Sequence, residues 1–157
     1  MRWQDIDQQP CSLARTLAII GDNWTLLVLR DCFMGVRRFD EFQQRLGVTR
    51  HVLSDRLRKL TEGGVLDKEA YQERPLRHEY RLTAMGKELY PVIVHLAQWG
   101  DKHLAGEHGA PLTRYHRQCG EPLEAQLQCS HCGDVVKPTD IRVEENPYWA
   151  GQILVNS

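Results

Sequence analysis

The stretch that decides the fold is residues 47–64, GVTRHVLSDRLRKLTEGG. Within it, Leu53, Leu57 and Leu60 recur at the spacing that places side chains on one stripe of a helix. Thr49 is a suitable N-cap, and the closing pair of glycines predicts where the helix ends. The stretch therefore predicts a short helix that buries leucine and turns its polar side chains to solvent.

A shorter helix is expected just before this one. Asp40 is a candidate N-cap for a helix over residues 41–46, in which Phe42 and Leu46 face inward. Gly47 then begins the turn into the next helix. Two short helices joined by a tight turn that contains glycine are typical of a helix-turn-helix.

A β-hairpin is expected after the second helix. Residues 65–71 and 77–82 have the composition of strands, and residues 72–76, which include a proline, form the predicted loop. A hairpin in this place is a wing, and it carries Arg74 at its tip and Arg77 beside it. The predicted fold class is therefore mainly α with a small β-hairpin wing, a winged helix-turn-helix.

Polar side chains on the second helix, and cations near it, are candidate DNA contacts. Hydroxyl, imidazole and guanidinium groups reach base edges in the major groove, whereas wing arginines hold phosphate or enter the minor groove. The alternative is that the polar face of the second helix is simply solvated. For Arg37 and Arg38, which precede the helix over residues 41–46, the alternative is ordinary surface. The predicted DNA-binding residues are Arg37, Arg38, Thr49, Arg50, His51, Ser54, Arg58, Arg74 and Arg77.

The charge and length of the chain limit the functions that it can have. A net charge of −1 over 157 residues means that any basic surface comes from local clustering. Nothing in the sequence resembles a membrane span or a signal peptide, so we expect a cytoplasmic protein without a membrane partner. We expect a winged-helix and dimerisation domain over residues 1–106 and a tail over residues 107–157.

A long helix with an apolar seam is expected after the wing. Thr83 is its candidate N-cap, and Pro91 is expected to kink it. The seam could pack in the core of its own chain. Helices expected over residues 12–20 and 24–34 already form such a core, so we expect the seam to pack against the same helix of a second chain in a homodimer. The predicted dimer-interface residues are Leu89, Val92, Leu96 and Trp99.

The tail contains two short motifs of the same form, His116-Arg-Gln-Cys119-Gly and Cys129-Ser-His-Cys132-Gly. Each folds two ligands back on one ion, and four such ligands close the tetrahedral shell of a structural zinc. We therefore expect a zinc-ribbon-like appendage with structural zinc as cofactor. His131 is a competing ligand, and a reduced, metal-free dithiol pair is the alternative.

The segment from Cys11 to Gly100 resembles the HxlR family of bacterial winged-helix transcriptional regulators. The resemblance implies a cytoplasmic homodimer that binds palindromic operator DNA and pairs through its N-terminal and long C-terminal helices. One departure is that the family often has proline directly after the first cysteine, whereas here Pro10 precedes it. The segments that carry the resemblance are GDNWTLLVLRDCFMGVRRFDEFQQRL, VLSDRLRKLTEGGVL, HEYRLTAMGKEL and AQWG.

Cys11 is a redox-sensing candidate. It precedes the first expected helix, whose N-terminus favours a thiolate, and Arg15 adds positive charge one turn later. Some members of the resembled family sense oxidants or electrophiles through a cysteine at this place. The alternative is a small, partly buried residue that packs under the N-terminal arm.

The alternatives to a DNA-binding regulator are a zinc-dependent enzyme and a zinc-ribbon protein-interaction adaptor. An enzyme needs an open metal position, a general base and a pocket. The sequence has closed ligand spacing and no His-Glu-x-x-His motif or nucleophile elbow. The sequence therefore favours a regulator that is not an enzyme.

Overall fold

The computed structural model describes residues 3–144 and 146–149, and these residues form two compact units that divide between Tyr90 and Pro91. Helices predominate, and the sheet consists of one antiparallel hairpin, so the predicted mainly α fold with a β-hairpin wing is confirmed. The units divide earlier in the chain than the expected boundary at residue 106, because the last long helix is grouped with the tail. In the described part of the chain, no helix is both long and apolar enough to cross a membrane.

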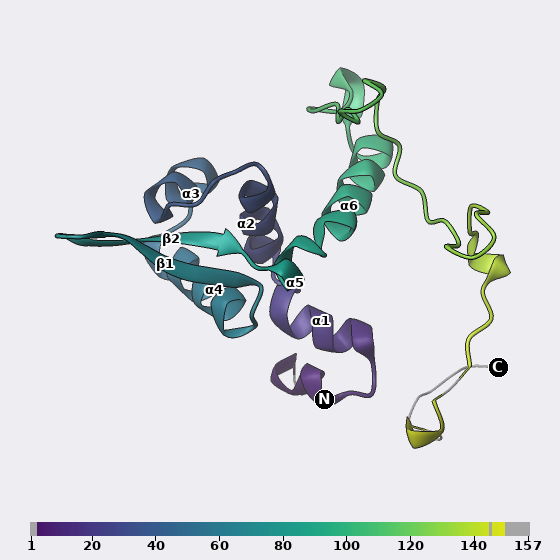
Figure 1. Ribbon diagram of the computed structural model, residues 1–157, viewed down its shortest axis with the longest axis horizontal. Helices are drawn as coiled ribbons and strands as arrows, with labels where there is room; N and C mark the ends of the chain where they lie inside the picture. The colour runs from purple at the N-terminus through teal and green to yellow at the C-terminus, as the bar shows by residue number, and fades with distance from the viewer. Residues whose placement is uncertain (1–2, 145, 150–157) are drawn as a thin grey trace. The chain divides into compact units, whose positions relative to one another are not determined.

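The first unit contains the winged helix (Figure 1). Its elements are a 3-10 helix (Trp3–Gln8), α1 (Ser12–Ile20), α2 (Asn23–Phe33), α3 (Phe39–Leu46), α4 (Arg50–Glu62), β1 (Leu66–Glu73), β2 (Leu76–Leu82) and α5 (Ala84–Lys87). The second unit contains most of α6 (Tyr90–His103), followed by three short 3-10 helices, Gly106–His108, Pro138–Asp140 and Pro147–Trp149.

The core of the first unit forms where α4 packs against α2 and α3. Leu53, Leu57 and Leu60 on α4 are fully buried, as their spacing predicts. The Thr49 hydroxyl accepts a hydrogen bond from the Val52 backbone N–H at 3.4 Å, which confirms the predicted N-cap. With these side chains buried, the polar residues of α4 are left on the solvent side.

The start of α3 differs from the prediction. The helix begins at Phe39, so Asp40 lies in its first turn and is not the N-cap. The Glu41 carboxylate accepts the backbone N–H of Arg38 at 3.3 Å and satisfies one donor at the helix start. The glutamate therefore does part of the capping that was expected of the aspartate.

The wing is longer than predicted, and the expected loop over residues 72–76 is wrong. Gln72 pairs with Arg77 and Glu73 with Leu76, so the strands continue until only Arg74 and Pro75 remain as the turn. A register irregularity between Ala70 and Gln72 accommodates the extra pairs. Figure 1 shows the long hairpin beside α3 and α4.

The predicted long, kinked helix is two separate helices. Thr83 caps α5, its hydroxyl accepting the Gly86 N–H at 2.9 Å, but the helix ends at Lys87 and α6 starts at Tyr90. Pro91 is thus the second residue of α6, where a backbone N–H has no intrahelical partner to lose. The chain breaks the helix before the proline, and no kink is needed inside it.

Candidate nucleic-acid interface

The predicted DNA-contacting side chains of α4 lie on its exposed face. Gly47 ends α3 in the left-handed region, at φ +66°, and so turns the chain toward α4. Arg50, His51 and Ser54 then follow on the first turns of α4, and all three are exposed. This end of the helix is therefore open to contact with base edges.

The arginines before α3 lie next to the wing. The Arg37 carbonyl accepts the Tyr80 backbone N–H at 2.8 Å, and Arg38 forms an isolated β-bridge with Glu79. The guanidinium of Arg38 lies over the ring of Tyr71, 4.7 Å from its centroid. These backbone contacts join the loop to β2, and both arginine side chains remain exposed.

A polar groove separates the N-terminal part of α4 from the wing. Arg50 lies on its helical side, with its guanidinium 5.0 Å from the Phe39 ring centroid and 3.9 Å from the Asp40 carboxylate. Arg77 and His78 lie on its wing side. Arg50 and Arg77 therefore place one cation from each element in the same groove, which the Asp40 and Glu41 carboxylates of α3 also line.

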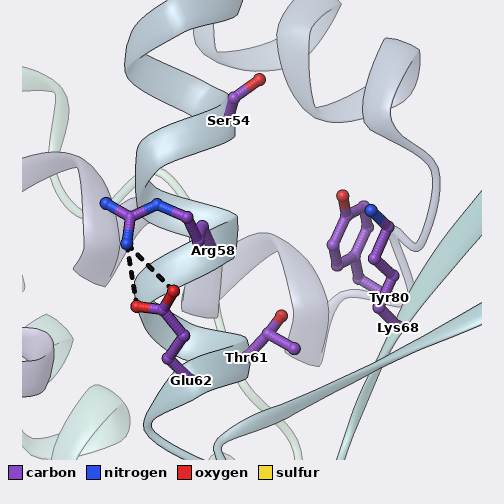
Figure 2. Close-up of a pocket in the computed structure, with 6 residues that line it drawn as sticks. All are labelled: Ser54, Arg58, Thr61, Glu62, Lys68 and Tyr80. Carbon is purple, nitrogen blue, oxygen red and sulfur yellow. Dashed lines mark hydrogen bonds and ion pairs between the residues drawn. The ribbon is translucent and has the colours of Figure 1, made fainter.

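Arg58 differs from the other predicted contacts because two carboxylates surround it. Its guanidinium donates to Asp55 at 2.5 Å and to both Glu62 oxygens at 2.9 and 3.0 Å. The hydrogen bond from Arg58 lowers the pKa of Asp55. Figure 2 shows the guanidinium turned toward Glu62 and away from Lys68 and Tyr80. Its DNA contact remains a prediction, and it would have to compete with both carboxylates.

Two residues of this surface were missed in the sequence. Lys68 on β1 and Tyr80 on β2 are cross-strand partners that line a groove together with Ser54 and Thr61 of α4 (Figure 2). Burial raises the pKa of Tyr80, so its hydroxyl remains protonated at neutral pH. The sequence did not predict which face of the strand is exposed, because the residues directly before and after Lys68 are also charged.

The cations of the surface fall into two groups. Among the described residues, no carboxylate lies within ion-pair distance of Arg37, Lys68, Arg74 or Arg77. Arg81, on the same strand as Arg77, is paired with carboxylates of Glu69 and Glu79 on the hairpin. The unpaired cations are the ones available to neutralise phosphate.

Comparison with known proteins identifies the fold's family. The model of the HxlR-like helix-turn-helix family matches residues 19–108, which is more than half of the chain. The chain belongs to this family. Its α3–α4 pair and hairpin are therefore the DNA-binding helix-turn-helix and wing of a transcriptional regulator.

Relatives and solved structures extend the match beyond the winged helix. The uncharacterised HTH-type transcriptional regulator Rv3095 of Mycobacterium tuberculosis is 44% identical over 142 residues, which is 90% of each chain. The structure of PA1607, described as a proposed transcription factor, is 35% identical with a TM-score of 0.80 and covers 89% of this chain and 98% of that one. The reduced form of the redox regulator HypR is 30% identical with a TM-score of 0.55, over 59% of this chain and 92% of its own.

Helix α6 of this HxlR-like chain has two different faces. Val94 is buried, and Gln98 hydrogen-bonds the backbone of Ala125 in the tail through both its amide nitrogen and its oxygen. The predicted interface residues lie elsewhere on the helix, and Leu89, in the break before it, is half-buried. The exposed fractions of Val92, Leu96 and Trp99 are 42%, 51% and 59%.

The predicted metal ligands of the HxlR-like chain are arranged as two pairs. His116 Nδ1 lies 3.3 Å from Cys119 Sγ. In the second pair, hydrogen bonds from the backbone N–H groups of Cys132 and His131 lower the pKa of Cys129. In the described part of the chain, no three His, Cys, Asp or Glu residues form a group that could hold a metal, so the structure brings each pair together but not all four ligands.

The two cysteines of the winged-helix unit have opposite environments. Cys11 is exposed at the N-cap position of α1 and makes no side-chain capping hydrogen bond. Cys32, on α2, has a pKa raised to about 12, mainly by burial and then by the charge of Asp31. Cys32 therefore stays a neutral thiol, and Cys11 is the accessible one.

Proposed function

We propose that the protein acts as a homodimer on palindromic operator DNA in the cytoplasm, with one α4 in each of two successive major grooves. Two such helices are separated by about one helical turn of DNA, ~34 Å. The observation that carries this proposal is the exposed N-terminal part of α4 together with unpaired cations on the wing side of the same groove. Double-stranded DNA is the partner that this arrangement fits best.

The two sides of the groove have different roles in this proposal. Arg50, His51 and Ser54, with Thr49 at the cap, face base edges and select sequence. The wing arginines and Arg37 bind phosphate or the minor groove, and contribute affinity to any sequence. Replacing Arg50 or His51 with alanine should therefore relax base preference, at a cost on the order of 1–3 kcal/mol per lost base contact.

A matched pair of arginines on β2 tests the docking. We expect Arg77→Ala to weaken binding to the gene's own upstream DNA about tenfold, or about 1.4 kcal/mol, as measured by fluorescence anisotropy. Arg81→Ala is the control, because carboxylates of Glu69 and Glu79 already offset that charge, and it should change affinity less than about twofold. Equal effects of the two variants, or no operator-specific binding by the wild type, would contradict the proposal.

The second copy in the dimer is proposed to cover the exposed stripe of α6. Val92, Leu96 and Trp99 follow one another at helical spacing, and each leaves much of an apolar side chain in water. Leu96→Asp would place a carboxylate in this interface, so sedimentation should report monomers and operator binding should collapse. Leu127→Asp, at a leucine that is 62% exposed in the tail, is the control that should remain dimeric. A dimeric Leu96→Asp variant would place the interface elsewhere.

A response to oxidants through Cys11 is the last part of the proposed function. It is supported by the exposure of the thiol at the start of α1 and by the similarity to HypR, a redox regulator. Diamide would accept two protons and two electrons from the Cys11 thiols of two protomers and leave a disulfide between them. We expect diamide to change operator binding of the wild type but not of Cys11→Ser. The same response in both proteins would exclude Cys11 as the sensor.

A further inference from the structure

The tail contains two turns with the same backbone structure. In the first, the N–H of His116 donates to the Glu121 carbonyl at 2.9 Å, and the N–H of Gly120 donates back to the His116 carbonyl at 2.8 Å. The second turn repeats both bonds at corresponding positions, from Cys129 to Asp134 and from Gly133 to Cys129, each at 2.9 Å. An isolated β-bridge flanks each turn, at Tyr115–Pro122 and at Gln128–Val135.

Each turn directs its two candidate ligands in the same way. Gly120 and Gly133, directly after the second ligand, both lie in the left-handed region, at φ +77° and +81°. This geometry folds the chain back so that the side chains three residues apart meet, as the 3.3 Å between His116 and Cys119 shows. The second turn has the same backbone hydrogen bonds and the same glycine conformation, so it folds Cys129 and Cys132 together in the same way.

The ligands also lack an ordinary structural role. Cysteine is among the residues most often buried, yet Cys119 and Cys132 are exposed, and so is His116. Among the described residues of this unit, Val94 of α6 is the one apolar residue that is buried, so packing does little to hold the turns in shape. A small unit of this kind usually needs a metal or a disulfide.

We propose that His116, Cys119, Cys129 and Cys132 bind one zinc ion per chain, with the two turns as the halves of one closed tetrahedral site. Binding would release the protons of the three thiols and leave no coordination position for water, so the site is structural. The short segment from Leu123 to Gln128 joins the turns and must bring them together on the ion. Gln98 holds Ala125, in the middle of this segment, through two hydrogen bonds, so the closed ribbon would remain attached to α6.

Cobalt provides the test, because Co²⁺ occupies such sites and reports its ligands by colour. Reduced, metal-free, full-length protein is titrated with Co²⁺ in the absence of DNA, and Zn²⁺ is then added as competitor. We expect thiolate charge-transfer bands and the visible bands of tetrahedral Co²⁺, complete at about one equivalent and removed by Zn²⁺. This measurement does not depend on operator binding, so its failure would leave the proposed DNA-binding function standing.

Matched variants test the ligand assignment. Cys132→Ser and His116→Asn should weaken Zn²⁺ binding by about a hundredfold or more, since even outer-shell partners are worth 10–100-fold. Cys11→Ser and His131→Asn are the controls, one cysteine and one histidine outside the ligand set, and should bind as the wild type does. No tetrahedral bands, one metal for two chains, or greater loss in His131→Asn than in His116→Asn would each overturn the proposal.

Discussion

The two units of the protein differ in the interactions that stabilise each of them internally. In the winged-helix unit, α2, α3, α4 and β1 contribute fully buried side chains, among them Leu29, Phe42, Leu57 and Leu66. In the second unit, the described contacts are mostly polar, such as the Arg114–Asp101 ion pair at 3.2 Å. Apolar burial is the dominant stabilising force in folding. The first unit therefore has its own source of stability, whereas the tail of the second unit depends on its hydrogen bonds to α6 and, on our proposal, on zinc.

The largest effect is expected from a cavity in the winged-helix core. Phe42→Ala removes a fully buried ring and should lower the free energy of unfolding by about 3–5 kcal/mol, measured by urea denaturation followed by circular dichroism. Leu127→Ala, at an exposed leucine of the tail, should change it by less than about 0.5 kcal/mol. Similar losses in both variants would show that the units do not differ as the burial pattern implies.

Removal of the metal should affect the tail of the second unit and leave the first unit unchanged. With a chelator present, trypsin should cleave the tail after Arg117 at least about tenfold faster than with one equivalent of Zn²⁺. The helical circular dichroism of the first unit should be unchanged in both conditions, because its core contains none of the ligands. Equal cleavage rates with and without zinc would mean that the tail is held by its protein contacts alone.

The first unit contains both a buried and an exposed carboxylate that are paired with arginine. Asp31 is fully buried on α2 and pairs with Arg30 at 2.8 Å and with Arg45 of α3 at 3.2 Å. Asp31→Asn should cost about 2 kcal/mol of folding stability, less than for a fully buried pair because both arginines remain partly hydrated. Glu62→Gln, in an exposed pair with Arg58, is the control and should cost less than about 0.5 kcal/mol. Calorimetry on the two variants measures this difference.

The smallest effect concerns two glycines with opposite roles. A Cβ at Gly47 would meet no atom within 4 Å, but the residue lies at φ +66° in the turn between α3 and α4. Gly47→Ala should therefore destabilise the first unit by about 1 kcal/mol through backbone strain alone. Gly100, inside α6, has neither a close neighbour nor a positive φ, so Gly100→Ala should stabilise that helix by about 0.5–1 kcal/mol. A shift of the same sign in thermal denaturation of both variants would refute this reasoning.

The sequence predicted the elements whose signals are local. The leucine stripe of α4, its Thr49 cap and the hairpin after it were found because helix periodicity, capping and strand composition depend on residues that are close in the chain. The family match confirms the winged helix-turn-helix and its role in transcription regulation. The expected N-cap at Asp40 was wrong by two residues, because the Glu41 carboxylate accepts the Arg38 backbone N–H at the helix start.

Which polar groups of these elements are available to bind DNA depends on contacts that form only in the folded chain. Arg58 has the same position on the helix as predicted, but its charge is offset by two carboxylates. Lys68 became part of the surface because pairing with Tyr80 faces it toward α4. Residue type and periodicity determine which side of an element is polar. Whether a charge on that side is paired depends on neighbours that folding brings together, and on the rotamer each long side chain adopts.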